Sequence, residues 1–135
     1  MQDYFNLKIV TVDKELADEK VTSFKCSDIK GEFVILANHS PLIALTVPCH
    51  SQYVTVSGET KDLFTSKGLL KLSDNKLLLI VDAGEEKADI DINRAKESLK
   101  RAEERLFSKE EGIDLSRARD SKERAEARIK TVEGI

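Results

Sequence analysis

This 135-residue sequence has no tryptophan, only two prolines and two cysteines, and no long apolar run. A membrane-spanning helix needs about 20 consecutive apolar residues, so we expect no membrane insertion. The first ten residues, MQDYFNLKIV, lack the basic patch and long apolar core of a secretory signal. The two cysteines form no CxxC pair, which is typical of ordinary thiols in a cytosolic protein.

Motifs for catalysis and metal binding are also missing. Neither histidine, His39 or His50, belongs to an HExxH pattern, and zinc needs more converging ligands than the chain offers. The sequence has no Gly-rich phosphate loop of the GxxxxGK[ST] or GxGxxG type, and no GxSxG nucleophile elbow. We therefore predict no catalytic residues and no metal site, and interpret the chain as a binding or structural protein.

Residues 1–84 have the pattern of an antiparallel β-sandwich. Short segments that alternate in polarity or are rich in β-branched residues are separated by turn signals, as in sandwiches and barrels. Three of these segments are continuous apolar runs, for which we expect strands buried on both faces. The predicted strands lie within residues 7–12, 21–26, 33–36, 42–47, 53–56 and 77–81, and the three apolar runs are 33–36, 42–47 and 77–81.

After Gly84 the apolar residues change to the spacing of helices. They recur at intervals of three and four, which predicts two helical stripes. Asp89 or Asp91 can cap the first helix, Gly112 breaks the chain, and Asp114 can cap the second. The short connection predicts an antiparallel two-helix hairpin over residues 85–135. The stripes are Ile92, Ala95, Leu99, Ala102 and Leu106, and then Leu115, Ala118, Ala125, Ile129 and Val132.

The two predicted helices repeat each other. Residues 90–105 align with residues 113–128, and nine of the sixteen positions are identical. All seven arginines of the chain lie in the predicted hairpin, and six of them form two trios with the spacing i, i+7, i+11. That spacing places each trio within a stripe roughly 40° wide on its helix. The trios are Arg94, Arg101 and Arg105, and Arg117, Arg124 and Arg128.

The arginine stripes have two interpretations. The guanidinium fork matches phosphate oxygens, which indicates an anion site for nucleotide phosphates between the helices. The alternative, which spacing alone favours, is a solvated helix pair with ion pairs such as Glu97–Arg101 and Asp120–Arg124. A nucleic-acid arm is excluded, because residues 85–135 carry 13 Lys+Arg and 14 Asp+Glu, a net charge of −1.

Three segments resemble the epsilon subunits of F-type ATP synthases. Residues 31–42, GEFVILANHSPL, resemble the family segment GE(F/L)GILPxHAPL, and residues 66–72 with 77–83 resemble its SGGFLEV and VTVLAD strands. Ile90, Asp91, Arg94 and Ala95 fit the (I/L)DxxRA motif of the family. The resemblance covers the whole chain in the family's order. Departures at Val34, Ala37, Cys49 and Lys67 change local turn geometry, not the assignment.

The resemblance implies a non-catalytic rotor subunit at the cytoplasmic face of the bacterial cell membrane. Its sandwich would bind the gamma subunit and the c-ring, and Glu32 and His39 match family loop positions that face the ring and the stalk. Its hairpin would either fold onto the sandwich or extend along gamma toward the alpha and beta subunits, where it inhibits ATP hydrolysis. The alternative is a stand-alone β-sandwich adaptor whose hairpin docks a partner helix.

Some members of that family bind ATP as a regulatory ligand when the hairpin is folded. The resemblance implies that arginines of both helices hold the phosphates, while Glu85, Asp91 and backbone groups at the start of the first helix hold the base or ribose. The positions that match are Glu85, Ile90, Asp91, Arg94, Ala95, Arg101, Arg124 and Arg128.

Overall fold

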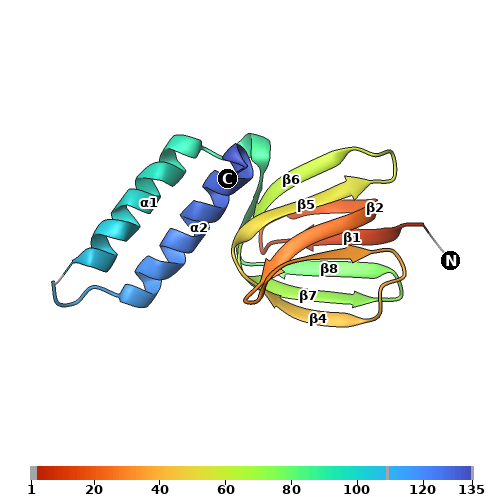
Figure 1. The fold of residues 1–135 in the computed structure, drawn as a ribbon, viewed down its shortest axis with the longest axis horizontal. Helices are drawn as coiled ribbons and strands as arrows, with labels where there is room; N and C mark the ends of the chain where they lie inside the picture. The colour runs from red at the N-terminus through yellow and green to blue at the C-terminus, as the bar shows by residue number, and fades with distance from the viewer. Residues whose placement is uncertain (1–2, 109, 135) are drawn as a thin grey trace.

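The computed structural model describes residues 3–108 and 110–134 and consists of a β-sandwich with a helical hairpin packed on one end of it (Figure 1). The predicted fold class is therefore confirmed. The strands are β1 (Phe5–Val10), β2 (Glu15–Asp28), β3 (Gly31–Leu36), β4 (Leu42–Thr46), β5 (Cys49–Thr55), β6 (Thr60–Thr65), β7 (Gly68–Ser73), β8 (Lys76–Val81) and β9 (Gly84–Glu86).

Strand β2 connects the two layers of the sandwich. It has 14 residues, and it pairs with β1, β3 and β5 and, at its last residue, with β4. The strands follow one another in the order β1-β8-β7-β4-β2-β5-β6-β9, with β3 beside β2. Every pairing is antiparallel except that of β1 with β8, which is parallel.

Large apolar side chains fill the space between the layers. Phe5, Leu7, Phe24 and Leu70 belong to this core and have no exposed surface. The three continuous apolar runs are, however, buried on one face only, so the expectation of strands buried on both faces is wrong. In β3, β4 and β8 inward residues alternate with exposed ones. The physical reason is that no element among residues 3–108 and 110–134 covers the outer face of these strands.

Two strands were not predicted from the sequence. Strand β6 begins with the polar residues Thr60, Lys61 and Asp62, which hide its buried half, Leu63 to Thr65. Strand β9 has only three residues and pairs with β6, placing Glu85 opposite Phe64. The sheet therefore continues to Glu86, and a single 3₁₀ turn at Lys87–Asp89 leads into the helices.

The hairpin consists of α1 (Ile92–Phe107) and α2 (Leu115–Glu133). Of the two possible caps of the first helix, the structure selects Asp91, whose carboxylate accepts a hydrogen bond from the backbone N–H of Arg94 at 3.1 Å. Asp114 caps α2 in the same way, accepting from the N–H of Arg117 at 3.0 Å. Each bond satisfies one of the donors left free at a helix start.

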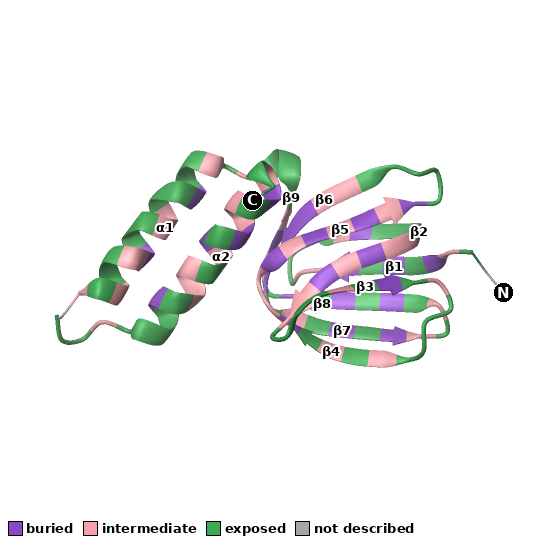
Figure 2. Ribbon diagram, viewed as in Figure 1, coloured by how far each residue is buried: buried purple, intermediate pink, exposed green. Residues whose placement is uncertain are grey.

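Helix α2 lies between α1 and the sandwich (Figure 1). Its buried residues Ala118 and Ala125 project within about 20° of each other, whereas Ala127 and Thr131 lie roughly 180–220° away from Ala118. The predicted stripe included the first pair and missed the second, because it assumed one buried face. Figure 2 shows the resulting bands of burial on α2. The Thr131 hydroxyl is satisfied within the helix by the Ala127 carbonyl at 2.8 Å.

Candidate functional site

The two arginine rows lie on the same side of the hairpin. On α1, Arg94, Ser98, Arg101 and Arg105 follow one another at intervals of four, three and four residues. Their equivalents on α2 follow the same intervals, about 60–120° around the helix from the alanine seam. Residues of both rows line the same cavities, so the rows face a common space rather than diverging.

The middle of this space, which we call the arginine cavity, has a volume of about 280 Å³. Four guanidinium groups and two serines line it, and no carboxylate does. Arg101 donates to the Ser98 hydroxyl at 3.4 Å, and Arg124 donates to the Ser121 hydroxyl at 3.4 Å. The lining residues are Ser98, Arg101, Arg105, Ser121, Arg124 and Arg128.

The concentration of positive charge in the arginine cavity is suited to a polyanion. Positively charged guanidinium groups that lie close together repel one another. A bound phosphate offsets this repulsion and accepts pairs of hydrogen bonds from their N–H groups. The predicted ion pairs Glu97–Arg101 and Asp120–Arg124 are not formed among the residues that the structure describes. Both guanidinium groups turn to serine hydroxyls instead.

A second cavity, of about 390 Å³, adjoins the arginine cavity at the start of α1, and we call it the α1-start cavity. Ser98 and Arg128 belong to both cavities. One carboxylate oxygen of Asp91 is occupied by the cap of α1, which leaves the other for a ligand. The lining residues are Glu85, Asp89, Asp91, Arg94, Ala95, Ser98 and Arg128.

Arg128 joins this site to the sandwich. Its Nε donates to the Glu85 carboxylate at 2.6 Å, and its guanidinium carbon lies 4.4 Å from the centre of the Phe64 ring. Because Glu85 and Phe64 are cross-strand partners on β9 and β6, the sandwich presents a carboxylate and an aromatic face together. The terminal nitrogens of Arg128 stay available to the cavities.

The structure brings together seven of the eight predicted ligand residues. Glu85, Asp91, Arg94 and Ala95 line the α1-start cavity, Arg101 and Arg124 the arginine cavity, and Arg128 both. Ile90 lines neither cavity. It precedes the cap and is half-buried. The prediction did not include Asp89, Ser98, Arg105 and Ser121. The internal repeat was a signal for the last three, because Ser98 aligns with Ser121 and Arg105 with Arg128.

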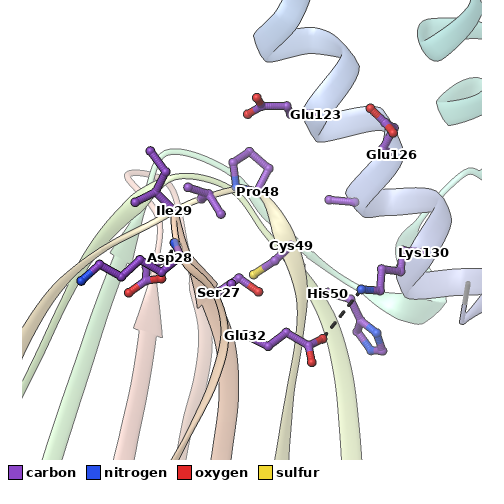
Figure 3. Close-up of a pocket in the computed structure, with 14 residues that line it drawn as sticks. Ser27, Asp28, Ile29, Glu32, Pro48, Cys49, His50, Glu123, Glu126 and Lys130 are labelled. Carbon is purple, nitrogen blue, oxygen red and sulfur yellow. Dashed lines mark hydrogen bonds and ion pairs between the residues drawn. The ribbon is translucent and has the colours of Figure 1, made fainter.

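Another cavity, of about 520 Å³, lies between α2 and the neighbouring edge of the sandwich (Figure 3). Lys130 of α2 forms an ion pair there with Glu32 of β3 at 3.7 Å, and Glu32 also pairs with Lys25 at 3.9 Å. Over residues 3–108 and 110–134, no group of three His, Cys, Asp or Glu side chains is placed to hold a metal ion. This cavity is a contact between the hairpin and the sandwich that is lined by both charged and apolar side chains.

The structure does not bring the two predicted partner-contact residues together. Glu32 lies at the start of β3, near α2, while His39 lies in the exposed turn after the other end of β3. The six residues of β3 separate them by about 17–20 Å. A partner that contacts both residues has to extend along the whole length of that strand.

The groups in the sandwich with a shifted pKa include the Cys26 thiol and the Asp62 carboxylate. Burial raises the pKa of the Cys26 thiol far above its usual range, with smaller contributions from Cys49 and Asp28, so this thiol is a core residue rather than a nucleophile. For Asp62, burial acts to raise the pKa, but hydrogen bonds from Gln52 at 2.9 Å and His50 at 2.7 Å outweigh it and lower the pKa.

No helix in the described part of the chain combines the length and the apolar character that crossing a bilayer requires.

Comparison with known proteins accounts for nearly the whole chain. Residues 4–87 match the family model of the ATP synthase delta/epsilon chain β-sandwich domain, and residues 88–132 match that of the delta/epsilon chain long α-helix domain. The chain is 40% identical over 111 residues to the ATP synthase epsilon chain of Clostridium botulinum, covering 82% of this chain and 84% of the relative. It is 42% identical over 110 residues to the epsilon chain of Clostridium novyi, with the same coverage.

Two solved structures have the same fold. A chain of the Euglena gracilis mitochondrial ATP synthase superposes with a TM-score of 0.84 at 17% identity, covering 94% of this chain and 80% of that chain. A chain from the central stalk and c-ring of the Tetrahymena thermophila mitochondrial ATP synthase superposes with a TM-score of 0.63 at 16% identity, covering 97% of each chain. At these identities the superpositions support the fold alone.

Proposed function

This chain belongs to the ATP synthase epsilon chains, non-catalytic subunits of the central stalk, and from that premise we propose that its hairpin is an ATP-responsive brake on ATP hydrolysis. In its folded posture the hairpin binds ATP and rests on the sandwich. In its extended posture it reaches along the gamma subunit toward the alpha and beta subunits and inhibits them. The alternative of a stand-alone adaptor is set aside, because it assumed no link to ATP synthase.

The arginine cavity is the single observation that carries the ATP proposal. Four guanidinium groups from two helices converge on it, and no carboxylate neutralises them within the cavity. A triphosphate supplies the missing negative charge only when both helices are side by side. The adjoining α1-start cavity holds Glu85, Asp89 and Asp91, whose acceptor oxygens suit the donors of a ribose or an adenine amino group.

Equilibrium dialysis of labelled ATP against the full chain tests this proposal. We expect saturable binding that Arg101→Ala or Arg124→Ala reduces at least tenfold, since a charge-assisted bond is worth about 1.5–3 kcal/mol. Arg119→Ala is the matched control, because Arg119 is the one arginine of the hairpin outside the two rows. If the row variants bind ATP as well as the control does, the proposed site is wrong.

Weak docking of the hairpin supports the two postures. Helix α2 offers the sandwich mainly Ala127, Thr131 and the contact of Arg128 with the Phe64 ring. Two ion pairs add to it, those of Arg128 with Glu85 and Lys130 with Glu32. So little apolar area at about 25 cal/mol per Å² gives only a few kcal/mol of docking free energy. ATP at 100 times its dissociation constant favours the posture it binds by about 2.7 kcal/mol, which is enough to reset such a balance.

Deletion of the hairpin tests the brake. The chain has to be cut after Lys87, because a cut at Gly84 also removes β9 and leaves β6 without this edge partner. We expect the assembled ATP synthase to hydrolyse ATP several-fold faster with the truncated chain, since the extended hairpin is gone. Unchanged hydrolysis, with the truncated chain still bound to the complex, contradicts an inhibitory hairpin.

An uncovered apolar face on the sandwich supports the gamma subunit and the c-ring as partners. On the outside of β4, β7 and β8, Leu45 lies beside Leu69, which lies beside Ile80. Ile43 and Leu78 lie in the adjacent row, on either side of Lys71. Ile43 and Leu45 are 70% and 73% exposed. A contiguous exposed apolar patch is typical of a protein interface. Glu32 and His39, at opposite ends of β3, are the proposed polar contacts to the ring and the stalk.

Co-purification with the gamma subunit tests the docking face. Leu69→Asp places a charge in the middle of the patch, so we expect binding to gamma to fall at least tenfold while the sandwich stays folded. The control is Val12→Asp, because Val12 is 93% exposed and lies in a loop outside the patch. Docked in this way, the chain is peripheral at the cytoplasmic face of the bacterial cell membrane and contacts no lipid core.

A further inference from the structure

The sequence repeat is also a structural repeat, with an offset of 23 residues. Asp91 and Asp114 cap the two helices with nearly the same backbone angles, φ −84° and ψ 99° against φ −80° and ψ 97°. Each cap accepts from the N–H three residues later, at 3.1 and 3.0 Å. Two like helices packed antiparallel are related by a local two-fold axis that runs perpendicular to both.

The arginine cavity lies on this axis. Its six lining residues form three pairs with the repeat offset of 23, namely Ser98 with Ser121, Arg101 with Arg124, and Arg105 with Arg128. Even the internal bonds repeat, because each of the central arginines donates to the serine three residues before it at 3.4 Å. A phosphate chain in this cavity therefore meets the same groups from either end.

A counterpart of the α1-start cavity lies at the other end of the hairpin. This α2-start cavity has a volume of about 510 Å³. Asp114, Arg117, Ala118 and Ser121 take the places of Asp91, Arg94, Ala95 and Ser98, and Arg105 takes the place of Arg128. The (I/L)DxxRA pattern thus occurs twice, as IDINRA at 90–95 and IDLSRA at 113–118. The lining residues are Arg105, Gly112, Ile113, Asp114, Arg117, Ala118, Ser121 and Arg124.

The two end cavities differ in charge. Three carboxylates and two arginines line the α1-start cavity, a formal charge of −1 from Glu85, Asp89, Asp91, Arg94 and Arg128. One carboxylate and three arginines line the α2-start cavity, a formal charge of +2 from Asp114, Arg105, Arg117 and Arg124. Gly112 stands where the first cavity has Asp89, and the sandwich contributes nothing equivalent to Glu85. On charge alone the second cavity is the better of the two for an anion.

We propose that the α2-start cavity is a second half-site for a nucleoside polyphosphate, with its phosphates in the shared arginine cavity. The inference rests on the proposed ATP site, whose half-site at Asp91 and Arg94 it duplicates. Because the half-sites share one phosphate cavity, a single ATP occupies them one at a time, in two opposite orientations. A ligand with a nucleoside at each end of one polyphosphate chain occupies both at once.

The dimensions suit such a two-headed ligand. Arg94 and Arg105 mark the two ends of the row on α1, and the 11 residue steps from one to the other span about 16 Å along the helix. The four guanidinium groups of the arginine cavity lie between these ends. A chain of four or five phosphates extends over a comparable length, so its charge falls where the arginines are and its nucleosides fall in the end cavities.

Titration calorimetry of the full chain with ATP and with P1,P5-di(adenosine-5′) pentaphosphate tests the proposal. We expect one ATP per chain, and binding of the dinucleotide that is tighter than that of ATP by at least about tenfold, because the second nucleoside binds intramolecularly. Arg94→Ala and Arg117→Ala each leave one orientation open, so each lowers ATP affinity only by several-fold. The double variant removes both orientations and loses ATP binding. Either single variant brings the dinucleotide down to the affinity of ATP.

Other outcomes separate the two proposals. If Arg94→Ala alone abolishes ATP binding while Arg117→Ala leaves the affinities for ATP and for the dinucleotide unchanged, the second half-site is wrong and the ATP site stands. If the wild-type chain binds neither ligand, the second half-site falls together with the ATP site. Arg119→Ala is the control for loss of one hairpin charge, and helical circular dichroism of each variant verifies that the hairpin is folded.

Discussion

The sandwich and the hairpin bury their residues in different ways. Inside the sandwich the fully covered positions are large, among them Phe5, Phe24 and Ile35, so each contributes substantial apolar area. The hairpin buries four alanines on its seam, Ala95, Ala102, Ala118 and Ala125, together with Ala127 and Thr131 on the side of the sandwich. Small side chains let the helices approach closely but remove little apolar surface from water.

This difference assigns the two parts different mechanical roles. The sandwich is held by its own core and keeps its shape with or without a partner. The helices are held by close contact, caps and a few ion pairs, and isolated helices of 16 and 19 residues are marginal in water. A ligand or a partner surface of a few kcal/mol is therefore decisive for the hairpin and irrelevant for the sandwich.

The contrast between the sandwich and the hairpin requires that the large core residues stabilise the sandwich. Phe24→Ala leaves a large void among fully buried neighbours, so we expect it to lower the free energy of unfolding by about 3–5 kcal/mol. Urea unfolding followed by tyrosine fluorescence measures this, because Tyr4 and Tyr53, the two tyrosines, both lie in the sandwich. Phe107→Ala is the matched control. Phe107 is 83% exposed at the end of α1, and its loss should change the sandwich transition by less than about 0.5 kcal/mol.

A larger side chain in the contact between α1 and α2 should destabilise the hairpin without affecting the sandwich. Ala125→Leu adds three carbons where α1 and α2 touch, which costs about 1–3 kcal/mol. We expect the ellipticity at 222 nm, which reports the helices, to be lost at a lower temperature while tyrosine fluorescence keeps its midpoint. Arg119→Leu, on the exposed side of α2, controls for the new leucine. If the midpoints of ellipticity and of tyrosine fluorescence shift together, the hairpin and the sandwich do not unfold independently.

Removal of a helix cap is a smaller perturbation of the same kind. Asp114→Ala deletes the acceptor of the Arg117 N–H, so α2 should lose about 1 kcal/mol, concentrated in its first turn. Hydrogen exchange measures this as faster exchange at the start of α2 and unchanged exchange in the strands. Asp120→Ala is the control, because Asp120 lies inside α2 and alanine is the better helix former there. If Asp114→Ala and Asp120→Ala change hydrogen exchange at the start of α2 equally, Asp114 does not act as the cap.

Periodicity and capping chemistry determined how much of the fold was predictable. The hairpin could be predicted from the spacing of its apolar residues. Between Asp91 and Leu106 these residues recur at intervals of three and four, which fits a helix and not a strand. Strand β6 could not be predicted in this way, because it begins with two charged residues, of which Asp62 bonds to β5 and Lys61 pairs with Glu59. The buried residues come only after them. Outward apolar residues such as Ile43 were assigned to the core, because the sequence alone does not distinguish an exposed apolar face from an interior.

The candidate site was less predictable than the fold. The arginines could be chosen from the repeat and from the family motif, because both are linear patterns. Their connection to the sandwich could not, since Arg128 meets Glu85 and Phe64 only after β9 has paired with β6. Ser98 and Ser121 were overlooked for a similar reason. A serine on a helix gains a role in a cavity only when the second helix places its guanidinium groups beside it.

The smallest expected effect concerns the edge of the sandwich on which α2 rests. Asp62 on β6 accepts hydrogen bonds from His50 and Gln52 on β5, and these bonds lower its pKa in the folded chain below the unfolded value of about 3.9. Unfolded chains therefore bind the proton first, so the stability from Asp62 is present above that value and is lost as the pH falls through the folded pKa. Asp62 is partly exposed, so its contribution stays below about 1 kcal/mol.

Asp62→Asn removes this titration, and thermal unfolding followed by tyrosine fluorescence between pH 6 and pH 2 measures it. We expect the midpoint of the variant to fall less steeply with acid than that of the wild-type chain, while Asp13→Asn, in an exposed loop, keeps the wild-type slope. If the curves of Asp62→Asn and the wild-type chain stay parallel, the β5–β6 bonds contribute nothing to the pH dependence. If ellipticity at 222 nm falls before the tyrosine signal in both chains, acid releases the hairpin before it reaches the sandwich, as the weaker burial of the helices requires.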